Sequence, residues 1–318
     1  MRYGALLAVL LFASGCASSV TGSNALIAPA NTSLVQAISG ASLYAGGPNV
    51  NEVDAYPAFT NNPQPDERIL AGLDAPTGIA VDQTGNVYVC NNAGQSVPGK
   101  GVFWTVTVYR RGQTSPFRTY TDDVFSPVDV AVAADETVYV ANFSSVVTVY
   151  PPGHLRPSHI LRAPPGYAPL GVAVDAARDA FVSYVPRSGG GGRVYEYAPG
   201  RSHGSDLGIT FSASPHGLAI DGHGDLIVAV SNAPNSGSSI EVFAPGQKRP
   251  KLTITGPFQP FMVALSRSGR RLFVADYGTG NNDGGVFVYA YPAGTLLFKD
   301  TQGTAAGAYG VAIDPSAP

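Results

Sequence analysis

Side chains that could bind a ligand or move a proton recur at matching positions of a repeated sequence. The candidate ligand-binding residues are Asn91, Asn92, Asn142, His216 and Asp276, and the candidate metal ligands are Asp129 and Asp276. Carboxylate and amide oxygens suit a hard divalent cation such as Ca²⁺. An imidazole can act as a general acid or base near neutral pH. The residue types therefore indicate an oxygen-lined site, with His216 as the candidate catalytic residue.

Each of these residues also has a purely structural explanation. An asparagine at the end of a strand can bond the backbone of a neighbouring loop, and Asp129 can do the same for its own loop. His216 can make an ordinary loop hydrogen bond. The other histidines, His154, His159, His203 and His223, fall in different phases of the repeat, whereas a zinc lyase needs several imidazoles around one point. The sequence therefore argues against a zinc lyase and leaves the remaining alternatives open.

The elements that position these side chains belong to a repeating strand–turn–strand unit. Its first copy, PTGIAVDQTGNVYVCN, spans Pro76–Asn91, and further copies start at Pro127, Pro169, Pro215 and Pro260. Apolar, β-branched runs flank a turn with Gly85 and Asn86, which favours a hairpin. A sixth copy from Ala308 stops after its first strand. Repetition every 42 to 51 residues is typical of a β-propeller.

Each copy continues with a third strand that ends in a Pro- or Gly-containing turn, followed by a more charged fourth segment. We expect the fourth segments to be the outer edge strands, because charge discourages edge-to-edge pairing. They are FRTYT, SHILR, LGITF, KLTIT and LLFKD. The segments missing from the sixth copy lie before Pro76. The sequence thus predicts an all-β, six-bladed propeller with four antiparallel strands per blade, whose last blade combines strands from Ser42 to Leu70 with GVAI near Val311.

The unit P-x-G-[IVL]-A-[VI]-D-x-x-G-[ND]-x-Y-V resembles the NHL repeat and, more broadly, the six-bladed class that includes gluconolactonase and regucalcin-like proteins. The resemblance covers nearly the whole chain after Gly40. Relatives of this class hold a divalent ion near the axis with Glu, Asn and Asp side chains. Here no glutamate matches their inner-strand ligand, and the motif around their catalytic aspartate is not recognisable. The fold alone does not choose a function.

Two rings of residues are expected to meet around the propeller axis. The ring that follows the second strands includes Asn91, Asn142 and Asp276. The ring that enters the first strands consists of Thr77, Val128, Leu170, His216, Phe261 and Tyr309. Loops on a rigid scaffold often carry binding specificity. We therefore expect a ligand- or protein-binding module that uses this loop face; the alternatives are a metal-dependent hydrolase of the gluconolactonase-like class and a lyase.

The N-terminus carries an export pattern. Residues 1–15 combine one early arginine with an apolar run that is too short to span a bilayer, which indicates a cleaved signal peptide. Ala13-Ser14-Gly15-Cys16 resembles a bacterial lipobox and implies lipidation of Cys16, an anchored protein of the cell envelope and outer-membrane sorting. Residues 17–40 lack strand alternation and are expected to form a tether, residues 41–318 the propeller. Cys90 then has no partner and fits a small core position.

The composition of the chain limits the classes of partner that it can bind. The formal net charge is −3, and charged residues make up 13% of the chain. A mildly acidic protein without basic runs is not expected to bind nucleic acid. We expect a monomer that reaches the membrane through its lipid anchor, with a protein or a small molecule as its ligand.

Overall fold

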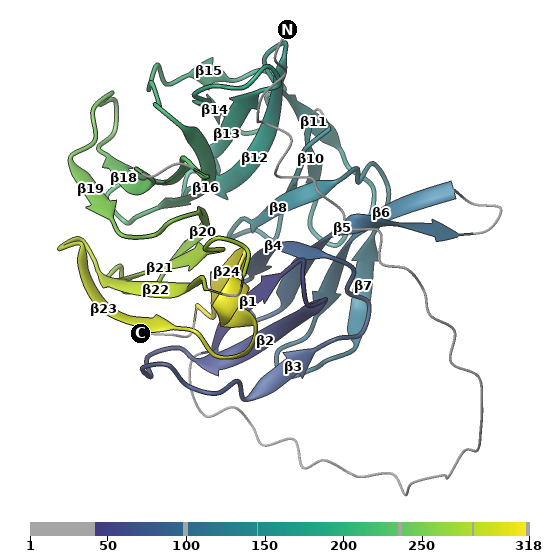
Figure 1. The fold of residues 1–318 in the computed structure, drawn as a ribbon. Helices are drawn as coiled ribbons and strands as arrows, with labels where there is room; N and C mark the ends of the chain where they lie inside the picture. The colour runs from purple at the N-terminus through teal and green to yellow at the C-terminus, as the bar shows by residue number, and fades with distance from the viewer. Residues whose placement is uncertain (1–41, 98–100, 145, 235–236, 282, 316–318) are drawn as a thin grey trace, which may run out of the picture. The chain divides into compact units, whose positions relative to one another are not determined.

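The computed structural model describes residues 42–97, 101–144, 146–234, 237–281 and 283–315, so the predicted signal peptide, Cys16 and the whole predicted tether lie outside the described residues. The described chain forms six four-stranded antiparallel sheets (Figure 1). We number them as blades 1 to 6, with β4–β7 as blade 1 and the sheet β24-β1-β2-β3 as blade 6. The predicted six-bladed all-β fold is confirmed.

The strands of each blade follow in the order inner to outer. Blades 1 and 2 contain β4 (Pro76–Val81), β5 (Val87–Val97), β6 (Gly101–Tyr109), β7 (Pro116–Tyr120), β8 (Pro127–Val132), β9 (Val138–Asn142), β10 (Val146–Tyr150) and β11 (His159–Arg162). Blades 3 and 4 contain β12 (Tyr167–Val174), β13 (Ala180–Pro186), β14 (Arg193–Tyr197), β15 (Ser205–Asp206), β16 (Ser214–Ile220), β17 (Leu226–Ser231), β18 (Ser239–Phe243) and β19 (Leu252–Thr255). Blades 5 and 6 contain β20 (Pro260–Leu265), β21 (Arg271–Asp276), β22 (Gly285–Ala290), β23 (Thr295–Asp300), β24 (Gly310–Ile313), β1 (Ser42–Gly47), β2 (Glu52–Pro57) and β3 (Glu67–Ile69).

The turns between first and second strands are built by the repeated aspartate. Asp82 Oδ1 accepts hydrogen bonds from the backbone amides of Thr84 and Asn86, both at 2.9 Å. Asp221 makes the same bonds to His223 and Asp225. A short acceptor side chain thus satisfies turn amides that have no strand partner. This carboxylate series is structural, as its phase in the repeat predicts.

The core lies between blades. Tyr88 of β5 packs with residues of β8, and Tyr139 of β9 packs with residues of β12. Phe273 of β21 packs with blade 6 residues such as Leu43. These aromatic rings occupy one phase of the repeat and fill the space between neighbouring sheets. Cys90 is fully buried, as expected for a core position.

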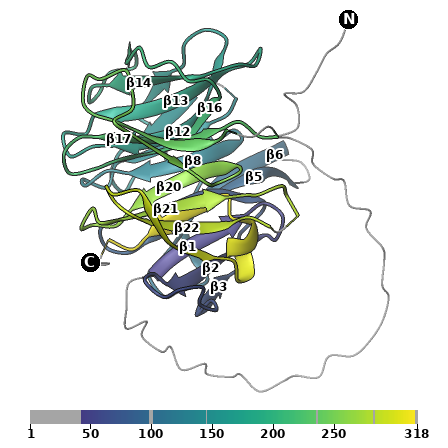
Figure 2. The same ribbon diagram turned by 60° about the vertical axis from the view of Figure 1, so that its left-hand side comes forward.

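The ring is closed by strands from both ends of the described chain. In blade 6, Ala45 of β1 pairs with Val311 of β24 on one side and with Asp54 of β2 on the other. The short 3-10 helix η1 (Gly303–Gly307) precedes β24 and lies beside blade 6 in both ribbon views (Figures 1 and 2). The predicted closure is confirmed, because β24 is the inner strand and β1, β2 and β3 complete the sheet.

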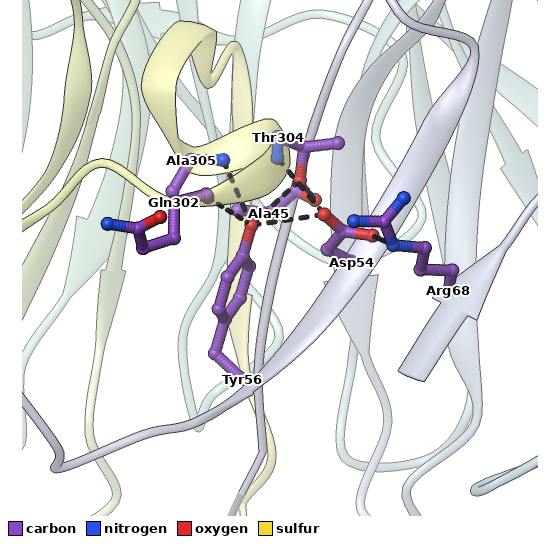
Figure 3. A network of polar contacts seen from close by, with 7 residues as sticks. All are labelled: Ala45, Asp54, Tyr56, Arg68, Gln302, Thr304 and Ala305. Carbon is purple, nitrogen blue, oxygen red and sulfur yellow. Dashed lines mark hydrogen bonds and ion pairs between the residues drawn. The ribbon is translucent and has the colours of Figure 1, made fainter. Parts of the chain in front are cut away.

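A polar network fixes η1 to blade 6 (Figure 3). Tyr56 Oη donates to the Gln302 carbonyl at 2.7 Å and accepts from the Ala305 amide at 3.0 Å. Thr304 donates its amide to Asp54 Oδ2 and its hydroxyl to the Ala45 carbonyl. Asp54 is fully buried and also faces Arg68 across 3.6 Å. The segment that leads into the closing strand is therefore held by side chains as well as by the sheet.

One predicted outer strand is wrong. The fourth strand of blade 3 is Ser205–Asp206, and LGITF (207–211) is not a strand. Gly208 adopts a φ of +69°, which breaks the extended chain. Ile209 and Phe211 then turn into the core that blade 3 shares with blade 4. Their alternation thus reflects loop residues anchored in the interior.

No helix among the described residues is long and apolar enough to cross a membrane.

Candidate functional site

The segments that enter the inner strands meet around the axis, as the repeat predicts. Thr77 Oγ1 donates to the Pro127 carbonyl of the next blade at 3.0 Å, and Ser183 Oγ donates to the His216 carbonyl at 2.6 Å. A Cβ on Gly310 would lie 2.0 Å from the Thr77 carbonyl oxygen, so blades 6 and 1 approach too closely for any side chain there. The ring of entry segments is therefore tightly packed.

Aromatic side chains gather on the blade 4–6 side of this ring. The rings of Phe261 and Tyr309 are stacked with centroids 3.8 Å apart, and the His216 ring meets Phe261 edge-on at 4.7 Å. Tyr277 contacts both Phe261 and Tyr309 edge-on, at 6.0 and 6.5 Å. We call His216, Phe261, Tyr277 and Tyr309 the aromatic mouth. It joins the inner strands of three blades with the loop that follows β21.

Two polar groups of the aromatic mouth have no partner among the described residues. Neither the ring nitrogens of His216 nor the hydroxyl of Tyr309 makes a hydrogen bond there, although the two residues are only 5% and 8% exposed. They are not among the fully enclosed unsatisfied atoms, so each keeps a route to solvent. Because solvent reaches both groups, each can exchange a water for a polar atom of a ligand. These two groups are therefore available to a ligand.

The two groups are uncharged at neutral pH. Burial lowers the pKa of His216 to about 3, so its imidazole stays neutral, with one donor and one acceptor nitrogen. Burial, together with the charges of Asp129 and Tyr277, raises the pKa of the Tyr309 hydroxyl. The mouth thus offers aromatic surface and neutral hydrogen-bonding groups.

Asp129 stands on the blade 2 side of the entry ring, where most copies have glycine. Its Oδ2 accepts from the Val172 amide of blade 3 at 2.8 Å, and its Oδ1 accepts from the Val130 amide at 2.9 Å. Burial raises the pKa of Asp129 to about 7, against the opposing effect of these two amides. Both oxygens are engaged with backbone, which is the structural alternative that the sequence left open.

The predicted polar residues after the second strands bond their own entry loops. Asn91 Oδ1 accepts from the Asp74 amide and Asn142 Oδ1 from the Phe125 amide, at 2.9 and 2.8 Å. Asp276 accepts from the amides of Phe258 and Gln259, at 3.1 and 2.6 Å. None of these three side chains makes a hydrogen bond to His216 among the described residues.

Asn92 links two blades. Its Nδ2 donates to the Pro127 carbonyl at 3.0 Å, and its Oδ1 accepts from the Ser126 hydroxyl at 3.2 Å. Its own carbonyl accepts from the indole of Trp104. Among the residues that the structure describes, no group of three or more His, Cys, Asp or Glu side chains is arranged to hold a metal. The metal and ligand-binding roles of the predicted residues stay predictions.

Sequence reasoning did not select Tyr277 and Asn49 for the site. Asn49, in the loop between β1 and β2, donates to the Tyr277 hydroxyl at 2.6 Å and so bridges blades 6 and 5 at the edge of the mouth. The available signal was the run of aromatic residues at the entry positions Phe261 and Tyr309, next to an aromatic residue directly after Asp276.

Comparison with known proteins identifies the architecture. No protein-family model and no curated protein matches the chain. A solved protein of unknown function from Bacteroides caccae is 14% identical, with a TM-score of 0.60 over 86% of this chain and 99% of its own. A Bacteroides uniformis protein, whose assignment as a 6-phosphogluconolactonase is itself provisional, is 15% identical, with a TM-score of 0.53 over 81% of both chains. Hydrazine synthase of Kuenenia stuttgartiensis is 12% identical, with a TM-score of 0.59 over 86% of both chains. At these identities the likeness is one of fold: this chain is a six-bladed β-propeller.

Proposed function

We propose that the chain is a binding module whose ligand contacts the aromatic mouth. The observation that carries the proposal is the pair of unpartnered polar groups, the His216 imidazole and the Tyr309 hydroxyl, beside the stacked rings of Phe261 and Tyr309. Buried polar groups are normally hydrogen-bonded, and exceptions call for an explanation. A ligand that supplies the missing partners is the explanation we favour.

The ligand class follows from the charge state. His216 and Tyr309 are neutral at pH 7, so these two groups supply no cation for a phosphate and no anion for an amine. Neutral donors and acceptors beside aromatic rings suit an uncharged ring compound with hydroxyl groups, such as a sugar. Tyr277 adds a third polar group, a hydroxyl that already accepts from Asn49 and can still donate. The residues of the aromatic mouth are largely covered. A ligand can therefore enter only when the hydrogen bond between Asn49 and Tyr277 breaks.

A metal-dependent hydrolase of the gluconolactonase-like class is the alternative. It has less support, because both oxygens of Asp129 and both of Asp276 already accept hydrogen bonds from backbone amides. A cation bound there would share these oxygens with the amides, and among the described residues no group of three or more His, Cys, Asp or Glu side chains is arranged to hold it. Hydrolysis of glucono-1,5-lactone that is abolished by a chelator and restored by Ca²⁺ would favour this alternative.

We further propose that the module is exported and anchored in the cell envelope. The support is the sequence alone: the apolar leader, the lipobox-like Ala13-Ser14-Gly15-Cys16 and the polar tether up to residue 40. The NHL-type spacing of the blades belongs to the same proposal. Labelling of expressing cells with a tagged fatty acid tests it, since the label should appear on the native chain and be lost in Cys16→Ser.

Calorimetric titration with a panel of neutral monosaccharides and disaccharides tests the binding function. Tyr309→Phe removes one hydrogen-bonding group from the mouth and should weaken the best ligand about 2- to 10-fold, the range for one hydrogen bond. Tyr139→Phe is the matched control, because Tyr139 is 6% exposed but lies between blades near the opposite strand ends. Equal affinities for both variants, or no binding by any panel member, would count against the proposal.

A further inference from the structure

The two ends of the blades form different faces. We call the ends where strands one and two, and three and four, are connected the turn face, and the ends that carry the aromatic mouth the loop face. Strand β1 begins at Ser42, opposite Pro57, and ends at Gly47, opposite Glu52. The Ser42 carbonyl accepts from the Asp314 amide at 2.9 Å. Ser42 is therefore fixed at the turn face, and the chain that precedes it must depart from there.

Arginines of blade 1 lie on one side of this departure point. Arg111 forms an ion pair with Asp314 at 2.8 Å and lies against Gly85 in the first turn of its blade. Arg110 and Arg118 lie over the ring of Phe117, at 4.6 and 5.6 Å from its centroid. Phe117 is 40% exposed. An apolar ring flanked by cations is thus presented at the turn-face end of the outer strand of blade 1.

Arginines of blade 5 lie on the other side. Arg271, at the start of β21, lies 4.9 Å from the ring centroid of Phe59, two residues beyond the partner of Ser42. Arg267 and Arg270 are exposed in the turn that precedes Arg271. We call Arg110, Arg111, Arg118, Arg267, Arg270 and Arg271 the basic collar. It flanks the departure point from both neighbouring blades.

The acidic residues near the basic collar do not cancel its positive charge. Asp314 is engaged by Arg111, and Asp82 is buried and bonded to its own turn. Asp66 and Glu67 remain, at the start of the outer strand of blade 6. Six arginines therefore stand against these four carboxylates and Asp221 of blade 4, which accepts from the Tyr291 hydroxyl beside Arg270, and the difference is one positive charge. The surface around Ser42 keeps a positive balance although the whole chain carries −3.

We propose that the basic collar docks on the headgroups of anionic phospholipids, with Phe117 at the interface and the aromatic mouth directed away from the bilayer. The proposal adds an orientation to the anchoring proposed above and rests on it. A lipid anchor alone holds a protein without fixing which face meets the membrane. Basic residues near an anionic surface add to membrane affinity, and stable attachment combines such a patch with acyl chains. The collar surrounds the point from which the anchored segment departs.

The single tryptophan of the chain makes the orientation measurable. Trp104 lies in β6 beside Thr105, which pairs with Asn91 at the loop end of blade 1. The purified full chain is mixed with vesicles whose phosphatidylglycerol carries brominated acyl chains, and tryptophan fluorescence is recorded. The native chain reports on the loop face, and Trp104→Phe combined with Phe117→Trp reports on the turn face. We expect at least about twofold quenching for the turn-face reporter and little change for Trp104.

Charge variants test the role of the collar. Arg110→Gln, Arg267→Gln and Arg270→Gln, combined in the turn-face reporter, should abolish most of the quenching. The matched control removes three positive charges near the loop face, with Arg162→Gln, Arg187→Gln and Lys299→Gln, and should leave it unchanged. Raising the salt from roughly 50 to 500 mM should mimic the collar variant, because screening shortens the range of the attraction.

Several outcomes would overturn the docking proposal. Equal quenching of Trp104 and of the turn-face reporter would contradict the orientation. Equal quenching on brominated phosphatidylcholine, or by the collar and control variants, would contradict headgroup recognition. Binding to soluble heparin as tight as to the anionic vesicles would assign the collar to a polyanion instead. Tyr309→Phe should leave the quenching unchanged, so that a failed sugar titration and a failed docking experiment are told apart.

Discussion

The carboxylate of Asp129 in blade 2 accepts a hydrogen bond from the Val172 amide in blade 3, over 2.8 Å. Its other oxygen bonds the Val130 amide, and its Cα lies where a Cβ on Gly78 of blade 1 would be. One side chain thus meets the inner strands of three blades near the axis. A buried carboxylate in this place makes the centre of the ring sensitive to pH.

Stability should fall as the pH rises through 7 because of Asp129. Its folded pKa of about 7 lies above the ordinary value of 3.8, so the folded state binds the proton more tightly than the unfolded state. The resulting contribution is present at low pH and is lost as the pH rises through the folded pKa. Between pH 6.5 and 8, a group with this pKa changes the free energy of unfolding by roughly 1 kcal/mol. Urea unfolding at several pH values measures it.

The same experiment needs Asp129→Asn as its control, since the variant cannot titrate and should have a flatter profile over this range. Below pH 6.5 the neutral, buried His216 acts in the opposite sense, because its pKa is lowered and acid then favours the unfolded state. Because His216, His159 and Asp300 also contribute above pH 6.5, the difference between the native chain and Asp129→Asn, and not either profile alone, reports Asp129. A profile identical in the native chain and in Asp129→Asn would contradict the assigned pKa.

Asn142→Ala should destabilise the propeller without acting through the mouth. Asn142 is fully buried, accepts from the Phe125 amide and donates to the Thr148 hydroxyl. Its loss leaves these partners unsatisfied, at a cost of about 1–3 kcal/mol. Asn281→Ala, in an exposed loop, should change the free energy of unfolding by less than about 0.5 kcal/mol. A variant at position 142 that folds as stably as the native chain and loses sugar binding would instead assign this residue to the ligand.

Tyr56→Phe should weaken the closure of the ring. The hydroxyl joins the Gln302 carbonyl and the Ala305 amide to blade 6 (Figure 3). These two groups also bond each other at 3.1 Å, so removal of the hydroxyl costs only its own hydrogen bonds, about 0.5–1.5 kcal/mol. Tyr289→Phe is the control, because the Tyr289 hydroxyl makes no hydrogen bond to another described residue. Thermal unfolding compares the two. An equal loss in both variants would show that the network contributes nothing specific to closure.

The repeat predicts the fold well because each copy contains its own start and turn. Proline opens the inner strands, aspartate and glycine form the turn, and even the split blade is visible as segments missing from the copy at Ala308. The outer strand of blade 3 was mispredicted because Ile209 and Phe211 alternate like a strand, while Gly208 turns the chain. Periodicity records which residues are buried and does not record the backbone conformation that buries them.

The site was predicted less completely, for a related reason. The phase of Asn142 and Asp276 correctly places them at the ends of second strands, whereas β5 continues past Asn91 to Val97. The direction of each side chain depends on which amides lack partners nearby. Those amides lie in the entry loops, whose path is not periodic. His216 reached the axis because its position belongs to the inner strand itself. The aromatic mouth depends on contacts between three blades, which no single copy contains.

The central claim is that the His216 imidazole in the aromatic mouth is neutral and forms a hydrogen bond with the ligand. Nuclear magnetic resonance of the labelled imidazole, recorded from pH 4 to 8 with and without a saturating neutral sugar, tests it most directly. The account predicts no titration of His216 above about pH 4, because its pKa is lowered to about 3, and a shift of its ring resonances when sugar is added. Titration of His216 near pH 6.5 would contradict it. Ring resonances that stay unchanged while a sugar binds to the protein would contradict it as well.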